Sequence, residues 1–108
     1  MKIATFNVNS VRARAEILTR WLERVGLDVL CLQETKVTDD LFPHELFQPF
    51  GYRCLVHGQK GYNGVATCLR SGADEVAKGF GDGDDEERRV LSVRLGELWI
   101  VNVYAPHG

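Results

Sequence analysis

The sequence predicts an α/β fold with a mixed β-sheet and flanking helices, and three observations support this. Two short runs of β-favouring residues, 2–8 and 28–33, enclose an amphipathic stretch of helical period. Such a strand–helix–strand order predicts two parallel strands that lie close in space. Several further apolar runs separated by short polar loops follow in the second half of the chain, which is typical of additional strands.

Length and composition indicate one small folded domain. The chain has 108 residues, of which 44% are hydrophobic and 26% charged, so global disorder is not expected. No apolar run approaches the roughly 20 residues of a membrane span, and the N-terminus lacks a signal-peptide core, so we expect a cytoplasmic protein with no membrane partner. The net charge of −2 argues against a generally basic surface, but Arg12, Arg14 and Lys60 can still form a local patch.

The first strand and helix follow from residue type and spacing. Residues 2–8 are almost all β-branched, aromatic or small, which favours a strand. Ser10 is expected to cap the next helix, because its hydroxyl can accept a hydrogen bond from a free backbone amide. Gly26 is expected to follow as the stop of that helix, because glycine can accept a positive φ. The predicted apolar face of the helix contains Ile17, Leu18, Trp21, Leu22 and Val25.

The second strand and a second helix come next. Residues 28–33 show no alternation of polarity, so this strand should be covered on both faces. Pro43 suits the first turn of a helix and Gly51 its end. The apolar side of that helix would contain Leu46, Phe47 and Phe50.

Further strands are predicted at residues 52–57, 62–69, 89–95 and 98–104, with a weaker segment at 76–80. The last strand is apolar on both sides, since Trp99, Val101 and Val103 alternate with Leu98, Ile100 and Asn102. Two helices are too few to cover every apolar face. We therefore expect a missing layer, supplied by another chain or by sequence that is absent here.

The three cysteines indicate neither a disulfide framework nor a thiolate zinc site. Their number is odd and no C-x-x-C pair occurs among Cys31, Cys54 and Cys68. Cys31 lies within an apolar strand, so it is expected to be a buried, inert thiol.

Two polar residues at strand ends form the main candidate site. Asn7 closes the first strand and Glu34 follows the second, and the carboxyl ends of parallel strands lie at one edge of a sheet. A carboxylate beside an amide oxygen suits Mg²⁺ or Mn²⁺. The alternatives are a solvated strand-end carboxylate for Glu34 and a simple turn former for Asn7.

Three other segments can contact a phosphate. Lys60, Tyr62 and Asn63 lie in a glycine-containing loop that offers a cation, a stacking ring and backbone donors, although an ordinary hairpin loop would look similar. Arg89 either grips a phosphate or neutralises the acidic loop before it. Tyr104, at the end of the last strand, either donates its phenol to a phosphate oxygen or packs as an aromatic ring.

Four segments together resemble the exonuclease III group of apurinic/apyrimidinic endonucleases, in the endonuclease/exonuclease/phosphatase superfamily. They are residues 1–14, 30–36, 57–66 and 102–108, in order and at family spacing. The resemblance implies half of a four-layer, DNase I-like α/β sandwich. It also implies a Mg²⁺-dependent (or Mn²⁺-dependent) phosphodiesterase that acts in DNA repair on duplex DNA at abasic sites and 3′ ends.

By resemblance, Glu34 ligates the metal, Asn7 organises that site, Asn9 stands near it and Tyr104 contacts the scissile phosphate. The residues implied to line the DNA face are Arg12, Lys60, Tyr62, Asn63 and Arg89.

The family's later motifs, Gly-Asp-x-Asn and Ser-Asp-His, do not occur in this sequence. Residues 1–108 therefore resemble the N-terminal portion of one domain. We expect them to be inactive alone and to need the C-terminal half or another chain. The alternatives are a non-catalytic nucleic-acid-binding or assembly fragment of the same fold, and a superfamily member that acts on phosphoinositides or other phosphodiesters.

Overall fold

The computed structural model describes residues 1–58, 61, 63–78 and 90–105, and within them the predicted α/β class is confirmed. Each predicted strand is present, with ends shifted by a few residues at most where both ends are described. The elements in chain order are β1 (Ile3–Asn7), α1 (Ala15–Arg24), β2 (Val29–Gln33), three 3₁₀ turns (Asp39–Leu41, His44–Leu46, Gln48–Phe50), β3 (Arg53–His57), β4 (Val65–Leu69), β5 (Glu75–Lys78), β6 (Val90–Leu95) and β7 (Leu98–Val103).

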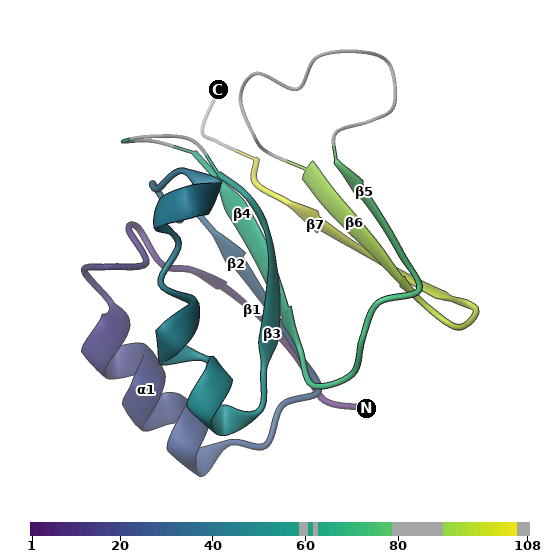
Figure 1. Cartoon of the computed structure of the whole chain (residues 1–108), viewed down its shortest axis with the longest axis horizontal. Helices are drawn as coiled ribbons and strands as arrows, with labels where there is room; N and C mark the ends of the chain where they lie inside the picture. Colours follow the sequence, from purple (N-terminus) through teal and green to yellow (C-terminus); the bar gives the residue numbers. More distant parts are fainter. Residues whose placement is uncertain (59–60, 62, 79–89, 106–108) are drawn as a thin grey trace.

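The strands form two sheets stacked on each other. The first sheet has the order β1-β2-β4-β3 and is mixed, because β1 and β2 are parallel and the other pairs antiparallel. The second sheet has the order β5-β6-β7 and is antiparallel. Figure 1 shows α1 and the 3₁₀ turns on one face of the first sheet and the second sheet beside its other face, which gives three layers.

The core lies on both sides of the first sheet. Leu30 points into a cluster with Leu18 and Phe47 of the helical layer. Val29 points the other way, into a cluster with Val93 of the second sheet. Burial of each such side chain stabilises the fold by about 1.5–3 kcal/mol. The continuous apolar run of β2 is explained by this two-sided cover, as predicted.

The outer face of the second sheet is apolar and exposed. On β7, Ile100 and Asn102 are buried, whereas Trp99, Val101 and Val103 are 47%, 54% and 45% exposed. The predicted alternation along this strand is therefore present. No part of the chain that the structure describes covers the outward residues.

The second predicted helix is wrong, because residues 39–50 form three separate 3₁₀ turns. Pro49 lies inside this segment, has no N–H to donate to the residue four earlier, and clashes with a continuing α-helix. The apolar residues of this segment still pack into the core, since Phe47 is fully buried. Gly51, with φ of 85°, ends the segment as predicted.

Helix α1 also differs from its prediction at both ends. The Ser10 hydroxyl accepts a hydrogen bond from the Ala13 amide at 3.3 Å, so it caps a preceding turn, and α1 begins only at Ala15. The helix ends because Val25 is extended, and Gly26 has no positive φ. Ile17 is 58% exposed, since it lies beside the edge strand β1. No helix in the described ranges has the length and apolarity to cross a membrane.

The structure joins Cys54 and Cys68 in a disulfide, which the number and spacing of the cysteines did not indicate. The two residues are directly opposed on the antiparallel strands β3 and β4. Spacing along the chain does not show this, because the contact depends on the register of two strands. Cys31 is a buried free thiol, as predicted, and burial raises its pKa.

Candidate functional site at the strand ends

The strongest candidate site is the rim, which we define as Asn7, Glu34 and Tyr104. Asn7 is the last residue of β1, Glu34 directly follows β2, and Tyr104 directly follows β7. The side chains of Tyr104 and Asn7 both hydrogen-bond to the Glu34 carboxylate. The predicted approach of Asn7 and Glu34 at one edge of the sheet is thereby confirmed.

The electrostatics of the rim favour the ionised form of Glu34. The hydrogen bond from Tyr104, and next that from Asn7, lower the pKa of Glu34, while partial burial opposes them. The Lys36 ammonium adds to the lowering from 3.8 Å away. Because the Glu34 side chain is still 20% exposed, a charged carboxylate is available to a ligand from solvent.

Backbone strain is concentrated in the loops of the rim. In the described residues, non-glycine residues with positive φ occur only in these loops. Such conformations cost about 1–3 kcal/mol each and persist only where surrounding contacts determine them. The residues are Asn9, Ser10, Glu34, Lys36 and Asn63, with φ between 46° and 84°.

Hydrogen bonds between neighbouring loops supply those contacts. The Ser10 amide donates to the Glu34 carbonyl at 2.8 Å, and the Thr35 amide donates to the Gly64 carbonyl at 3.1 Å. A side chain at Gly64 would collide with the Thr35 hydroxyl. The loops after β1, β2 and β3 are therefore held side by side, and the glycine permits the closest approach.

The other predicted site residues are only partly described. Arg12 is exposed in the loop after β1, and its guanidinium donates to the Leu41 carbonyl at 3.4 Å. The Asn63 carbonyl accepts from the Lys36 amide at 3.0 Å, so Asn63 lies beside the rim loops. Lys60, Tyr62 and Arg89 lie outside the described residues.

Three polar residues near the rim were not predicted as site residues: Lys36, Gln33 and Asn102. The Lys36 ammonium donates to the Asn9 side-chain oxygen at 2.5 Å and approaches Glu34, so it links two strand-end loops. Its position two residues after Glu34 was the one available signal. Gln33 and Asn102 looked like ordinary strand residues, and only their partners in the fold distinguish them.

The rim suits part of a divalent-metal site. Glu34 and Asn7 offer hard oxygen donors of the kind that Mg²⁺ prefers. In the described ranges, no three His, Cys, Asp or Glu side chains come together. Magnesium usually binds through one or two carboxylates and keeps several waters, so this incomplete donor set fits it.

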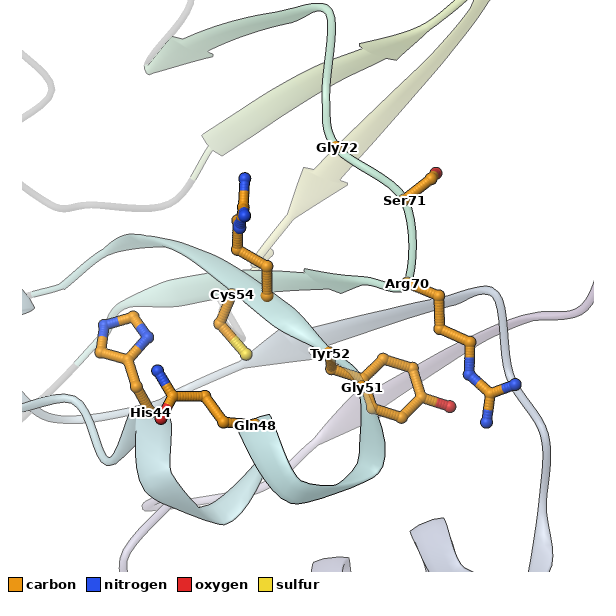
Figure 2. Close-up of a pocket in the computed structure, with 9 residues that line it drawn as sticks. His44, Gln48, Gly51, Tyr52, Cys54, Arg70, Ser71 and Gly72 are labelled. Carbon is orange, nitrogen blue, oxygen red and sulfur yellow. The ribbon is translucent and has the colours of Figure 1, made fainter.

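A cavity of about 340 Å³ lies at the opposite end of the first sheet. Arg53 begins β3 and Arg70 follows β4, whereas β2 reaches Glu34 at the other end. Figure 2 shows His44 and the Arg70 guanidinium on opposite sides of Tyr52. Arg70 stacks on that ring at 5.1 Å. These basic side chains do not converge on one ligand position, so the rim is the better candidate.

Comparison with known proteins shows the family to which the chain belongs. The Endonuclease/Exonuclease/phosphatase family matches residues 4–107. Exodeoxyribonuclease III from Haemophilus influenzae is 38% identical over 113 aligned residues, covering all of this chain and 42% of that protein. The structure of an AP endonuclease from Archaeoglobus fulgidus has a TM-score of 0.91 and 39% identity, covering 98% of this chain and 41% of that one.

The 3′ phosphatase NExo from Neisseria, bound to a product DNA hairpin, has a TM-score of 0.90 and 40% identity, covering 96% of this chain and 41% of that one. The chain thus spans about two fifths of the length of these relatives. The matched region runs from β1 to the residues after β7 and so contains all three rim positions. This agreement of sequence and fold confirms the resemblance, and the chain belongs to the endonuclease/exonuclease/phosphatase family.

Proposed function

We propose that this chain supplies the metal-facing and phosphate-facing part of a DNA repair nuclease. The whole protein would hydrolyse phosphodiester bonds of duplex DNA at abasic sites and 3′ ends, in the cytoplasm. The observation that carries the proposal is the ionised Glu34 carboxylate, hydrogen-bonded by Asn7 and Tyr104 at one strand edge. The names of the relatives, an exodeoxyribonuclease III and an AP endonuclease, support this reaction class.

Glu34 and Asn7 would hold the divalent ion, Mg²⁺ or Mn²⁺. When bound, the ion neutralises charge on the phosphoryl oxygens and on the departing 3′ oxygen. Glu34 suits this role because a glutamate is ionised near neutral pH, and its hydrogen bonds and lowered pKa favour the charged form further. The Asn7 side-chain oxygen also accepts from the Asn9 amide at 3.1 Å, which fixes the direction of this second donor.

Tyr104 would orient the phosphate. Its phenol already donates to Glu34, so it lies beside the position where the ion and a phosphate oxygen would meet. A donor fixed at this position stabilises developing negative charge without rearranging. Arg12, Lys60, Tyr62, Asn63 and Arg89 would contact the DNA backbone, which sets the position of the duplex without reading its sequence.

The general base would come from outside these residues. The chain spans 42% of the exodeoxyribonuclease III from Haemophilus influenzae, and the rim contains one carboxylate and no histidine. Loss of a general base typically costs about 10²–10⁴-fold in rate, so we expect negligible turnover from this chain alone. The remaining part of a full-length protein would also cover the exposed face of the second sheet.

A second candidate is a non-catalytic nucleic-acid-binding or assembly fragment of the same fold. The exposed apolar face formed by Trp99, Val101 and Val103 favours it, because such a face suits association. The strained, hydrogen-bonded Glu34 favours the nuclease, because a binder of an anionic backbone gains nothing from a carboxylate there.

A chimera separates these candidates. The chain is joined to the portion of the Haemophilus influenzae exodeoxyribonuclease III that it does not cover, and nicking of an abasic-site duplex is measured with Mg²⁺ and with a chelator. For a nuclease, Glu34→Gln should lower kcat by about 10²–10³-fold, whereas Lys60→Ala should mainly raise KM. Glu45→Gln, an exposed carboxylate elsewhere, is the matched control.

For a binder, Lys60→Ala should weaken DNA binding while Glu34→Gln leaves it unchanged or stronger. A folded chimera that binds the duplex but shows no metal-dependent nicking would contradict the nuclease proposal.

A further inference from the structure

Three polar side chains form a hydrogen-bonded chain directly below the rim. The Gln33 amide nitrogen donates to the Thr5 hydroxyl oxygen at 2.8 Å and to the Asn102 side-chain oxygen at 2.8 Å. Both hydrogens of the Gln33 amide are used in this arrangement. We call Thr5, Gln33 and Asn102 the lower layer.

Each member of the lower layer lies on a strand that carries a rim residue. On β1, Thr5 comes two residues before Asn7, so both point to the same face. On β2, Gln33 directly precedes Glu34 and is paired with Asn7. Asn102 on β7 comes two residues before Tyr104 in the same way.

Asn102 connects the two sheets. Its amide nitrogen, which has two hydrogens to donate, lies within hydrogen-bond distance of the Leu32 carbonyl at 3.1 Å, the Ala66 carbonyl at 2.8 Å and the Thr67 hydroxyl at 3.3 Å. These acceptors belong to β2 and β4 of the first sheet, whereas Asn102 belongs to the second. Asn102 is only 2% exposed, so these hydrogen bonds are shielded from water.

Stability alone does not explain an amide at this position. The neighbouring core residues of the second sheet, Val93 and Ile100, are apolar, and an apolar side chain at position 102 would avoid the cost of burying an amide. Apolar surfaces are non-directional, whereas hydrogen bonds to fixed carbonyls specify one position of β7 against β2 and β4. The Asn102 amide therefore contributes a defined position of β7 relative to β2 and β4.

We propose that Thr5, Gln33 and Asn102 are positioning residues that fix the register between the two sheets and so hold Tyr104 against Glu34 and Asn7. The inference deepens the proposed function. It rests on that function only for the purpose of the contact between Tyr104, Glu34 and Asn7, and not for the existence of the contact. Its test measures the geometry without metal or DNA, so a failure would leave the proposed nuclease function standing.

The test uses ¹⁹F NMR of the 108-residue chain with 3-fluorotyrosine at its three tyrosines. Tyr104→Phe assigns the resonance of residue 104. Because Tyr104 touches Glu34, the variant Glu34→Gln should shift that resonance in the otherwise native chain. The size of this shift reports whether the contact between the two sheets is intact.

Asn102→Leu should reduce the shift caused by Glu34→Gln by about two-fold or more, because the two positions are coupled through the lower layer. Ile100→Ala is the matched control, since Ile100 lies on the same strand and face and is also buried. That control removes packing without removing a hydrogen bond. It should lower stability and leave the shift unchanged.

Thr5→Val keeps the proposal testable if Asn102→Leu does not fold. Thr5 is exposed, so its variant should fold, and Thr5→Ser should restore the shift that Thr5→Val reduces. A full shift in folded Asn102→Leu would overturn the proposal. If only Thr5→Val is folded, a full shift there would overturn it, as would an equal loss in Ile100→Ala.

Discussion

The two sheets differ in how completely this chain covers them. In the first sheet, all five residues of β4 and four of the five in β2 are buried. In the second, every residue of β5 is exposed and β7 is buried only at alternate positions. The inner strands β2 and β4 of the first sheet are thus covered on both faces, and the second sheet is covered on one side in the described residues.

The residues of the rim come from both sheets, so they differ in how well their supporting strands are covered. Asn7 and Glu34 are positioned by the first sheet, where Glu34 follows the buried inner strand β2 and Asn7 ends the partly exposed edge strand β1. Tyr104 is positioned by the second sheet, whose outer face is open. The side of the site that we propose to face the metal therefore includes a residue held by a fully covered strand, and the side that we propose to face the phosphate depends on how firmly the second sheet is attached.

The largest expected effect comes from removing cover of the first sheet. Phe47 is fully buried in the helical layer and packs edge-on against Phe42 with ring centroids 5.6 Å apart. Phe47→Ala should cost about 3–5 kcal/mol of unfolding free energy, measured by urea titration followed by circular dichroism. Leu41→Ala, in the same segment but 52% exposed, is the control and should cost far less. Equal costs would show that the helical layer does not support the sheet.

Substitution of two glycines, one in a loop of each sheet, tests how much strain the two loops tolerate. Gly96, in the β6–β7 turn, has φ of 62° and open space around it, so Gly96→Ala should cost about 1–2 kcal/mol from backbone strain alone. Gly64, beside the rim, has φ of 92°, and a side chain there would also strike Thr35. Gly64→Ala should cost about 1–3 kcal/mol more.

Gly72→Ala is the control for these two variants, since Gly72 has neither a positive φ nor a close neighbour. The same urea titration ranks all three. A Gly64→Ala chain as stable as Gly96→Ala would mean that the loops of the rim can separate at little cost.

The acid dependence of stability measures the rim itself. The pKa of Glu34 is lowered in the folded chain, so the unfolded chain takes up a proton at higher pH. The stabilising contribution is therefore complete above the usual glutamate pKa and is lost as the pH falls through the folded value. Glu34→Gln lacks this contribution at every pH.

The difference in unfolding free energy between wild type and Glu34→Gln should consequently shrink between about pH 7 and about pH 3. Tyr104→Phe should move the transition toward the usual glutamate pKa, because the Tyr104 hydrogen bond is the largest cause of the shift. If the difference in unfolding free energy stays constant across this pH range, the hydrogen bonds from Tyr104 and Asn7 do not stabilise the charged form of Glu34.

The first sheet was the easier one to predict from sequence. Strand β1, helix α1 and strand β2 follow from local residue patterns, and the parallel pairing of the strands brings Asn7 and Glu34 to one edge. The 3₁₀ turns around Pro49 were missed, because an apolar pattern does not by itself distinguish helix types.

Contacts between distant strands could not be predicted. The Cys54–Cys68 bond depends on the register of two antiparallel strands. Asn102 finds Gln33 across 69 residues of sequence, and its partners include backbone carbonyls that every residue possesses. No residue pattern distinguishes such an amide from an ordinary strand position. For the same reason, the contacts that connect the second sheet to the rim are known only from the three-dimensional structure.

The smallest expected effect tests the open face directly. Val101 points outward from β7 and is 54% exposed, so Val101→Thr should change the unfolding free energy by no more than about 0.5 kcal/mol. Val93→Thr makes the same change on the inner face, where the side chain is fully buried, and should cost about 1–3 kcal/mol. A cost above about 1.5 kcal/mol for Val101→Thr would mean that a second copy covers this face, because a buried hydroxyl has that effect. Repeating the titration at several protein concentrations identifies that case, since stability supplied by association rises with concentration.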